Sequence, residues 1–256
     1  MINSPQFSIV IPSFNQGKFI KETIDSILHQ SVEQVEIIVV DGGSTDITLE
    51  VLRSFGDQIF WISEKDRGQT HAINKGIALA RGEIVAYLNS DDYYLPNALE
   101  NVWAAFQNNP SVKWVSGDYV IIDEGGKPIQ SSIAYYKSFW RKRFNFLILT
   151  ILNPIIQPST FLRRSFQQQI GDFNENLRYT MDYEYWIRAL QLGSPLIMKE
   201  QLSAFRIHGD SKGGSQYKMQ FAEELSVAKQ YQKKTIPILL HKWHNLLIEF
   251  VYKLIK

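Results

Sequence analysis

The first half of the chain alternates short, mainly apolar runs with segments whose apolar residues recur at helical spacing. The apolar runs are 7–11, 36–40, 59–62 and 84–88, and the clearest helical segments are 19–28 and 70–80. A short apolar run is typical of a buried strand, and recurrence every three or four residues is typical of a helix. This alternation predicts repeated βαβ units around a parallel sheet that carries helices on its faces.

Polar loops follow the first three runs at 12–17, 41–46 and 64–69, and the acidic pair Asp91 and Asp92 follows the fourth. The carboxyl ends of parallel strands meet at one edge of a sheet, where open α/β sheets bind their ligands. Two adjacent carboxylates at that edge favour a cation, and their hard oxygen atoms suit Mg²⁺ or Mn²⁺ shared with substrate phosphates. The alternative is that Ser90 or Asp91 only caps a helix that begins near Pro96.

The second half of the chain follows a different pattern. An aromatic and basic stretch occupies 135–146, and a pair of short strands is predicted at 196–207. Helical spacing returns at 182–192 and from 216 onward. In the tail, Leu239, Leu240, Trp243, Leu247 and Phe250 recur at helical spacing, with basic residues on another face. Such a helix is expected to contact an anionic membrane, its own domain or a second subunit.

Composition narrows the functional classes. The 256 residues are 45% hydrophobic and 21% charged, with a formal net charge of +1, so no overall basic footprint for nucleic acid is present. The absence of cysteine excludes disulfides, thiolate metal sites and cysteine nucleophiles. Residues 1–6 do not read as a signal peptide, and neither 144–156 nor 236–255 is an uninterrupted apolar span. These features predict a cytoplasmic protein.

The loops at the predicted edge carry groups that suit a nucleotide. In the first loop Pro12 is a rigid turn residue, Phe14 offers a ring for stacking and Asn15 offers an amide for hydrogen bonds. In the second, Asp41 is placed to accept from a base or a ribose hydroxyl, and the two glycines after it allow close approach. For both loops an ordinary turn is the alternative.

Two other classes of nucleotide-binding protein are disfavoured, because the sequence lacks their motifs. The chain has no G-x-G-x-x-G turn after a strand, which a dinucleotide dehydrogenase needs. It also has no Walker A sequence, so phosphate binding by a P-loop is not expected.

Several motifs together resemble a known family. They are 7–15, 39–46, 63–68, 72–76 and 88–92, followed by 157–161, 171–173, 181–186 and 205–212. In this order they are similar to family 2 glycosyltransferases, inverting enzymes that use nucleotide-diphosphate sugars. The resemblance implies an α/β GT-A (Rossmann-like) fold, with a mostly parallel sheet, flanking helices and a helical C-terminal extension. The implied divisions are a glycosyltransferase domain over 1–215, with a nucleotide-sugar half at 1–117 and an acceptor half at 118–215, and the extension at 216–256.

The resemblance also implies roles for donor-binding residues. Asp41 is expected to contact the base, Asp91 the ribose, and Asp92 a divalent Mg²⁺ or Mn²⁺ that bridges the diphosphate. Lys75 is expected to lie near the nucleotide. His208 resembles the late histidine that these enzymes often use as a further metal ligand.

For catalysis, Asp182 resembles the aspartate that serves the family as general base. Met181 stands where the family often has glutamate, and a second acid, Glu184, lies two residues further on. On a helix these two acids point in different directions, so only one is expected to face the acceptor. We expect Asp182 to be the base and Glu184 to be structural, with capping of the following helix as the alternative for Asp182.

The function expected from this resemblance is inverting sugar transfer from a nucleotide-diphosphate sugar, with a UDP-sugar favoured. The expected acceptor is a glycan or a polyprenyl-linked sugar, in surface polysaccharide biosynthesis on the inner face of the plasma membrane. A homodimer is a further expected arrangement. One alternative is a sugar-phosphate nucleotidyltransferase, although 12–16 lack the glycine-rich loop with Arg and Lys that it needs. The other is a non-catalytic module that binds nucleotide sugars or membranes.

Overall fold

The alternating pattern folds into one sheet of eight strands in the order β3-β2-β1-β4-β7-β6-β8-β5. The computed structural model describes residues 4–209 and 217–255. The strands are β1 (Phe7–Ser13), β2 (Val35–Asp41), β3 (Phe60–Ser63), β4 (Ile84–Tyr87), β5 (Tyr93–Tyr94), β6 (Trp114–Ile122), β7 (Thr160–Arg163) and β8 (Leu196–Arg206). The α-helices are α1 (Ile20–Leu28), α2 (Thr48–Ser54), α3 (Gln69–Leu79), α4 (Ala98–Asn108), α5 (Ser131–Arg141), α6 (Phe146–Ile151), α7 (Arg164–Ile170), α8 (Met181–Leu192), α10 (Tyr217–Tyr231) and α11 (Thr235–Ile255). Two short 3₁₀ turns, η1 (Gly56–Gln58) and η2 (Gln157–Ser159), complete them.

The first four strands form the parallel part of the sheet. β1 pairs in parallel with both β2 and β4, and β3 pairs in parallel with β2. The remaining half is mixed, because β7 is antiparallel to β4 and to β6, whereas β8 is parallel to β6 and antiparallel to β5. The predicted mostly parallel α/β sheet with flanking helices is therefore confirmed.

One prediction about the second half is wrong. The two short strands expected at 196–207 are the single 11-residue strand β8. Continuous pairing with β6 explains the difference, because register shifts around Asp118 keep the two strands hydrogen-bonded along their length.

Alternate residues of the strands feed two large hydrophobic cores, one on each face of the sheet, and a smaller cluster forms around Tyr119, Ile121 and Ile156. Phe7, Ile9 and Ile11 of β1 pack on one face with apolar residues of α1 and α4. Val10 packs on the other face, in a core that contains residues of α3, α7 and α8. Within this second core the rings of Trp114 and Trp186 stack with their centroids 5.7 Å apart.

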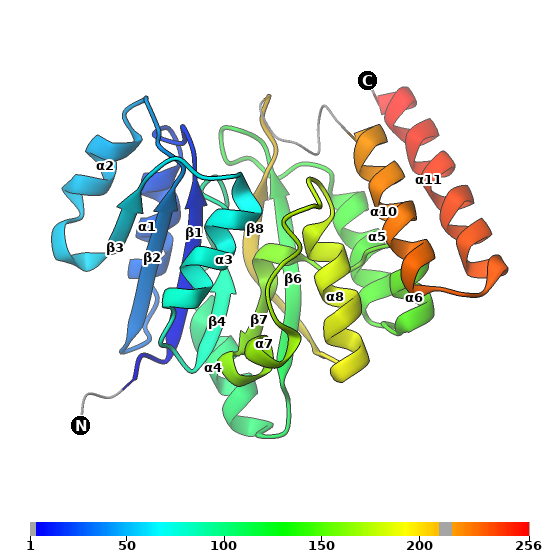
Figure 1. Cartoon of the computed structure of the whole chain (residues 1–256), viewed down its shortest axis with the longest axis horizontal. Helices are drawn as coiled ribbons and strands as arrows, with labels where there is room; N and C mark the ends of the chain where they lie inside the picture. Colours follow the sequence, from blue (N-terminus) through cyan, green and yellow to red (C-terminus); the bar gives the residue numbers. More distant parts are fainter. Residues whose placement is uncertain (1–3, 210–216, 256) are drawn as a thin grey trace.

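The helical tail lies at one end of the molecule. Figure 1 shows α11, in red, beside α10 and α6 at the end opposite α2 and β3. In the described part of the chain, no helix is both long enough and apolar enough to cross a bilayer.

Candidate functional site

The acidic pair lies just beyond the carboxyl end of β4, next to the end of β8. Short β5 pairs with β8 and brings Asp92 against Arg206. The Asp92 side chain is 1% exposed, and its carboxylate accepts from the Arg206 backbone N–H at 2.9 Å and from Asn89 Nδ2 at 3.1 Å. Burial and the neighbouring charge of Asp91 raise the pKa of Asp92 well above its usual range.

Asp91 contacts the predicted late histidine. Its Oδ2 lies 2.9 Å from His208 Nε2, and the His208 ring packs on the ring of Phe19 with centroids 4.9 Å apart. The Asp91 side chain is more exposed than that of His208, at 20% against 6%. The structure thus brings the three predicted residues Asp91, Asp92 and His208 together, from segments more than 100 positions apart along the sequence.

The alternative that Ser90 or Asp91 caps the next helix is wrong. Helix α4 begins at Ala98, and its N-cap residue is Asn97. Asp91 and Asp92 are therefore held by β8 and its continuation, and their carboxylates are not used as a helix cap.

Arg206 joins the acidic pair to the surrounding loops, and sequence reasoning missed it. Its side chain is 3% exposed; Nε donates to the Asp91 carbonyl at 2.9 Å, and another nitrogen forms an ion pair with Glu22 at 2.5 Å. It also donates to the Glu124 carbonyl at 2.9 Å. Its charge opposes the rise in the pKa of Asp92. Its place in the motif 205–212 was the only signal in the sequence.

A line of amide side chains was also missed. Gln69 donates to Asn89 Oδ1 at 2.8 Å, and Asn89 donates to Gln157 Oε1 at 3.2 Å. Gln157 in turn donates to the Tyr87 carbonyl at 2.7 Å. These residues fix the segment after β4 to α3 and to η2. Asn89 directly precedes the acidic pair in sequence, which was the available signal.

The loops after β1 and β2 lie side by side and share hydrogen bonds. Ser13 pairs with Asp41 in the parallel register, and Asn15 Oδ1 accepts from the Thr45 backbone N–H at 2.9 Å. Asn15 has a positive φ of 53°, and the adjacent Phe14 is 59% exposed. Pro12 is buried inside β1. A flat ring and a polar loop are therefore presented at the edge of the sheet.

Asp41 organises the turn in which it lies. Its side chain is fully buried, and its carboxylate accepts four hydrogen bonds. The donors are the Gly43 and Ser44 backbone N–H groups and the Ser44 and Ser63 hydroxyls. Turn formation, the alternative for this residue, is thus present, and the predicted base contact stays a prediction. Lys75 of α3 forms an ion pair with Glu64, in the loop after β3.

Asp182 lies in the first turn of α8. Its Oδ1 accepts from the Tyr183 backbone N–H at 2.8 Å, while Thr180 is the N-cap residue. Burial raises the pKa of Asp182, and the charge of Lys137 opposes that rise. Burial, followed by the charges of Asp182 and then Asp92, raises the pKa of Tyr87. Asp182 and Asp92 therefore both lie in the electrostatic surroundings of the Tyr87 hydroxyl.

Glu184 has different surroundings. It is 5% exposed, and Arg188 Nε donates to its carboxylate at 2.9 Å. The Tyr231 hydroxyl donates to the same carboxylate at 2.5 Å. These contacts hold Glu184 between α8 and α10, so it does not share the environment of Asp182.

The acidic pair and His208 can be compared with the needs of a divalent cation. Two ligands at right angles around an ion with bonds of about 2.1 Å lie roughly 3 Å apart. Asp91 Oδ2 and His208 Nε2, at 2.9 Å, match that separation. Among residues 4–209 and 217–255, no three Asp, Glu or His side chains form a metal site by themselves. Asp91 and His208 therefore fit a cation whose other ligands come from a substrate or water.

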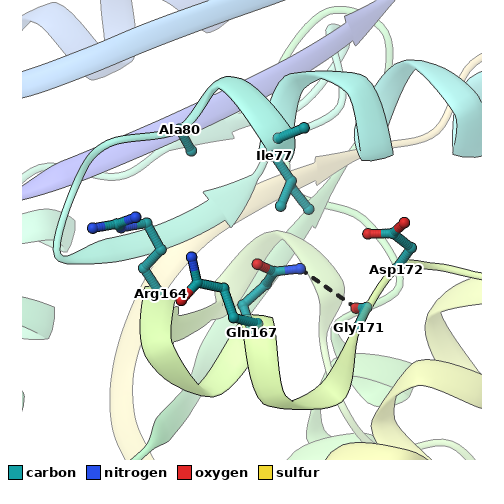
Figure 2. Close-up of a pocket in the computed structure, with 8 residues that line it drawn as sticks. Ile77, Ala80, Arg164, Gln167, Gly171 and Asp172 are labelled. Carbon is teal, nitrogen blue, oxygen red and sulfur yellow. Dashed lines mark hydrogen bonds between the residues drawn. The ribbon is translucent and has the colours of Figure 1, made fainter.

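A separate pocket of about 300 Å³ lies between α3 and α7. Figure 2 shows Arg164, Gln167 and Asp172 around it, with Gln167 Nε2 donating to the Gly171 carbonyl at 3.4 Å. None of the predicted site residues lines this pocket. Its position gives it no part in the chemistry at the carboxyl edge.

Comparison with known proteins decides the family. The sequence profile of the family described as Glycosyl transferase family 2 matches residues 8–171. The chain belongs to glycosyl transferase family 2. It is 32% identical over 213 residues to an uncharacterized glycosyltransferase of Rickettsia typhi, covering 80% of this chain and 65% of the relative. The chain thus spans slightly less than two thirds of that relative's length.

Solved glycosyltransferase structures share the fold. S. aureus TarS 1-349 in complex with UDP-GlcNAc superposes with a TM-score of 0.68 at 20% identity, covering 87% of this chain and 65% of that chain. The mannosyltransferase PcManGT from Pyrobaculum calidifontis, in complex with GDP-Man and Mn²⁺, gives 0.72 at 18% identity, covering 95% and 70%. The predicted GT-A fold is confirmed by these likenesses.

Proposed function

We propose that this glycosyltransferase moves a sugar from a nucleotide-diphosphate sugar to the hydroxyl of a glycan or lipid-linked acceptor, with inversion at the anomeric carbon. The proposal is carried by the contact between Asp91 and His208 at the carboxyl edge of the sheet. It is supported by the UDP-GlcNAc and the GDP-Man with Mn²⁺ in the two structural neighbours. A role in surface polysaccharide biosynthesis is part of the proposal.

The donor nucleotide is assigned to the loops after β1 and β2. The exposed ring of Phe14 offers a face for the base, and Asn15 lies beside it in a loop that hydrogen bonds hold in place. The four hydrogen bonds that Asp41 accepts hold the loop after β2 in place beside this surface. We favour a UDP-sugar as donor, with Lys75 close to its phosphates.

The cation is assigned to Asp91 and His208, because Asp91 Oδ2 and His208 Nε2 lie 2.9 Å apart and could both bind one ion. Asp92, predicted from sequence as the metal ligand, is turned inward to Arg206 and Asn89, and in this proposal it positions the end of β8. The other carboxylate oxygen of Asp91 is assigned to the predicted contact with the ribose. A Mg²⁺ or Mn²⁺ ion held there would supply positive charge to the leaving diphosphate.

Asp182 is assigned as general base. It removes the proton from the acceptor hydroxyl, whose oxygen then forms a bond to the anomeric carbon as the bond to the diphosphate breaks. Burial raises the pKa of Asp182, which makes its carboxylate a better proton acceptor than an exposed one. The charge of Lys137 limits that rise.

A panel of nucleotide-diphosphate sugars incubated with the protein, Mn²⁺ and simple sugar acceptors tests this proposal. We expect release of nucleoside diphosphate to depend on one donor, and NMR of the product to show the anomeric configuration opposite to that of the donor. Product that retains the donor configuration would contradict direct attack by the acceptor. Binding without release for every donor and acceptor would favour the non-catalytic module.

A further inference from the structure

Helix α11 faces the protein with the polar side chains of His241 and Asn245, beside the buried Pro237 and the partly buried Ile238, and presents most of its large apolar residues to solvent. His241 is fully buried, and its Nδ1 lies 2.7 Å from the Thr150 carbonyl oxygen of α6. Asn245, one turn further on, is 7% exposed and donates to the Phe221 carbonyl of α10. An amphipathic helix that packs on its own domain normally buries the opposite face. The apolar side of α11 is therefore left for another partner.

The exposed side of α11 is a continuous apolar stripe. Its members are Ile236 at 71% exposed, Leu239 at 47%, Leu240 at 46%, Trp243 at 72%, Leu246 at 60%, Leu247 at 58% and Phe250 at 59%. At 3.6 residues per turn these positions fall within about 120° of the helix circumference. We call them the α11 stripe. Exposed apolar surface gathered in this way marks a binding surface.

Aromatic and basic side chains extend this end of the molecule. Tyr135 and Phe139 of α5 are 74% and 40% exposed, and the Arg143 guanidinium lies 3.9 Å from the centre of the Phe139 ring. Lys142 and Arg143 are exposed, and so is Lys242, which flanks the α11 stripe. Helix α6 contacts α11 through the Thr150 carbonyl and His241, and the Tyr136 ring of α5 stacks on that of His244 with the ring centroids 6.1 Å apart.

We propose that the α11 stripe lies in the headgroup region of an anionic lipid bilayer. The charges decide between a bilayer and a second copy of the chain. Lysine is depleted in protein interfaces, whereas lysine beside exposed Trp and Leu suits an anionic headgroup region. The three exposed cations Lys142, Arg143 and Lys242 provide that charge. In the described residues no helix can span the bilayer, so α11 lies along its surface.

This placement connects the membrane to the assigned base, and that part of the inference depends on the proposed function. Helix α10 lies between α11 and α8, and its Glu223 carboxylate accepts from three backbone N–H groups at the start of α8. The donors are Arg178 at 3.0 Å, Tyr179 at 2.7 Å and Thr180 at 2.9 Å. Asp182 follows two residues later. A bilayer held by α11 would present a lipid-linked acceptor on the side of the molecule that carries the base.

Vesicle flotation of the full chain tests the inference. Wild type is compared with a Trp243→Gln, Leu247→Gln double variant, using vesicles with phosphatidylglycerol and vesicles of phosphatidylcholine alone. We expect wild type to float with the anionic vesicles, less at high salt, and the double variant to partition at least about tenfold less. The matched control is Ile47→Gln, which changes an equally exposed apolar residue, at 58%, at the other end of the molecule. It is expected to float like wild type.

Two results would overturn the inference. One is equal flotation of wild type and the double variant. The other is a wild-type dimer in analytical ultracentrifugation that the double variant dissociates, which would make the stripe an interface between copies. Far-ultraviolet circular dichroism shows whether the variants remain folded. Nucleotide titration of the same samples without vesicles keeps failure of the proposed function distinct from failure of membrane binding.

Discussion

Asp182 and Glu184 lie two positions apart in α8, yet their neighbours give them different properties. Glu184 is held by Arg188 and Tyr231, so its oxygen atoms already have charged and hydroxyl donors. Asp182 has a backbone donor, and burial raises its pKa. The sequence predicted that only one of the two would face an acceptor, because residues two apart on a helix point in different directions. The ion pair and the tyrosine contact supply the physical reason for the choice.

At Asp182 we expect the Asp182→Asn variant to lose about 10² to 10⁴ in kcat, since an amide cannot accept the acceptor proton. Nucleotide affinity is expected to stay within a factor of about two or three, because the side chain is assigned to the acceptor and not to the donor. Steady-state kinetics and calorimetry measure the two quantities. Undiminished transfer would move the role of base to another residue.

Glu184→Gln is the matched control for that variant. It leaves the Arg188 guanidinium without its carboxylate, and we expect the free energy of unfolding to fall by about 1 to 3 kcal/mol. Urea denaturation measures this change. A variant of full stability that has lost transfer would show that Glu184 acts in catalysis.

The assignment of the cation predicts a separate effect at Asp91. In Asp91→Asn we expect Mn²⁺ to tighten binding of nucleoside diphosphate by at least about tenfold less than in wild type, because a neutral amide is a poorer ligand than a carboxylate. Calorimetric titration with and without Mn²⁺ measures this difference. An Asp91→Asn variant with the full metal effect, together with an Asp92→Asn variant that has lost it, would return the role to Asp92.

At the scale of elements, the parallel strands and the helices between them were predictable, because their apolar runs and helical spacing are local patterns. The mixed half was less so. Strand β8 was predicted as two pieces, since its continuity depends on register shifts in its pairing with β6. The bond from the Arg206 N–H to Asp92 joins residues 114 positions apart, and no local pattern encodes such a contact. Arg206 was therefore missed although Asp92 was found.

The packing of α10 on α8 predicts a pH dependence of stability. Burial, with a further contribution from Asp182, raises the pKa of Glu224 to about 7, although Lys137 opposes the shift. In the unfolded chain Glu224 has the ordinary pKa of a glutamate. At pH values between that pKa and about 7, the folded state therefore binds one more proton than the unfolded state. Folding stability contributed by this group therefore falls as pH rises through that window. We expect a loss of about 1 to 3 kcal/mol between pH 5 and pH 8.

Comparison of wild type with Glu224→Gln measures this effect. Chemical denaturation at several pH values is expected to give a flatter profile for the variant, because glutamine does not titrate. Parallel profiles would show that the buried Glu224 is ionised in the folded protein across the whole range.

At the scale of the whole molecule, the carboxyl edge of one sheet gathers groups from both halves of the chain. The fold and the place of the loops after β1, β2 and β4 at this edge could be inferred from sequence, because strand ends in an α/β sheet share a side. The roles proposed for Asp91 and Asp92 could not, because they rest on contacts with His208 and Arg206, which lie more than 100 positions further along the chain. The exposure of the apolar face of α11 could not be predicted either. The spacing of apolar residues shows that a helix has such a face, but not whether that face packs against the protein.

Isothermal titration of UDP, GDP and their sugars, with and without Mn²⁺, tests the central claim most directly. We expect one nucleotide class to bind, the metal to tighten it by at least about tenfold, and His208→Ala to remove most of that gain. Failure of every nucleotide to bind in the presence of metal, or a metal effect that is unchanged in His208→Ala, would contradict the account.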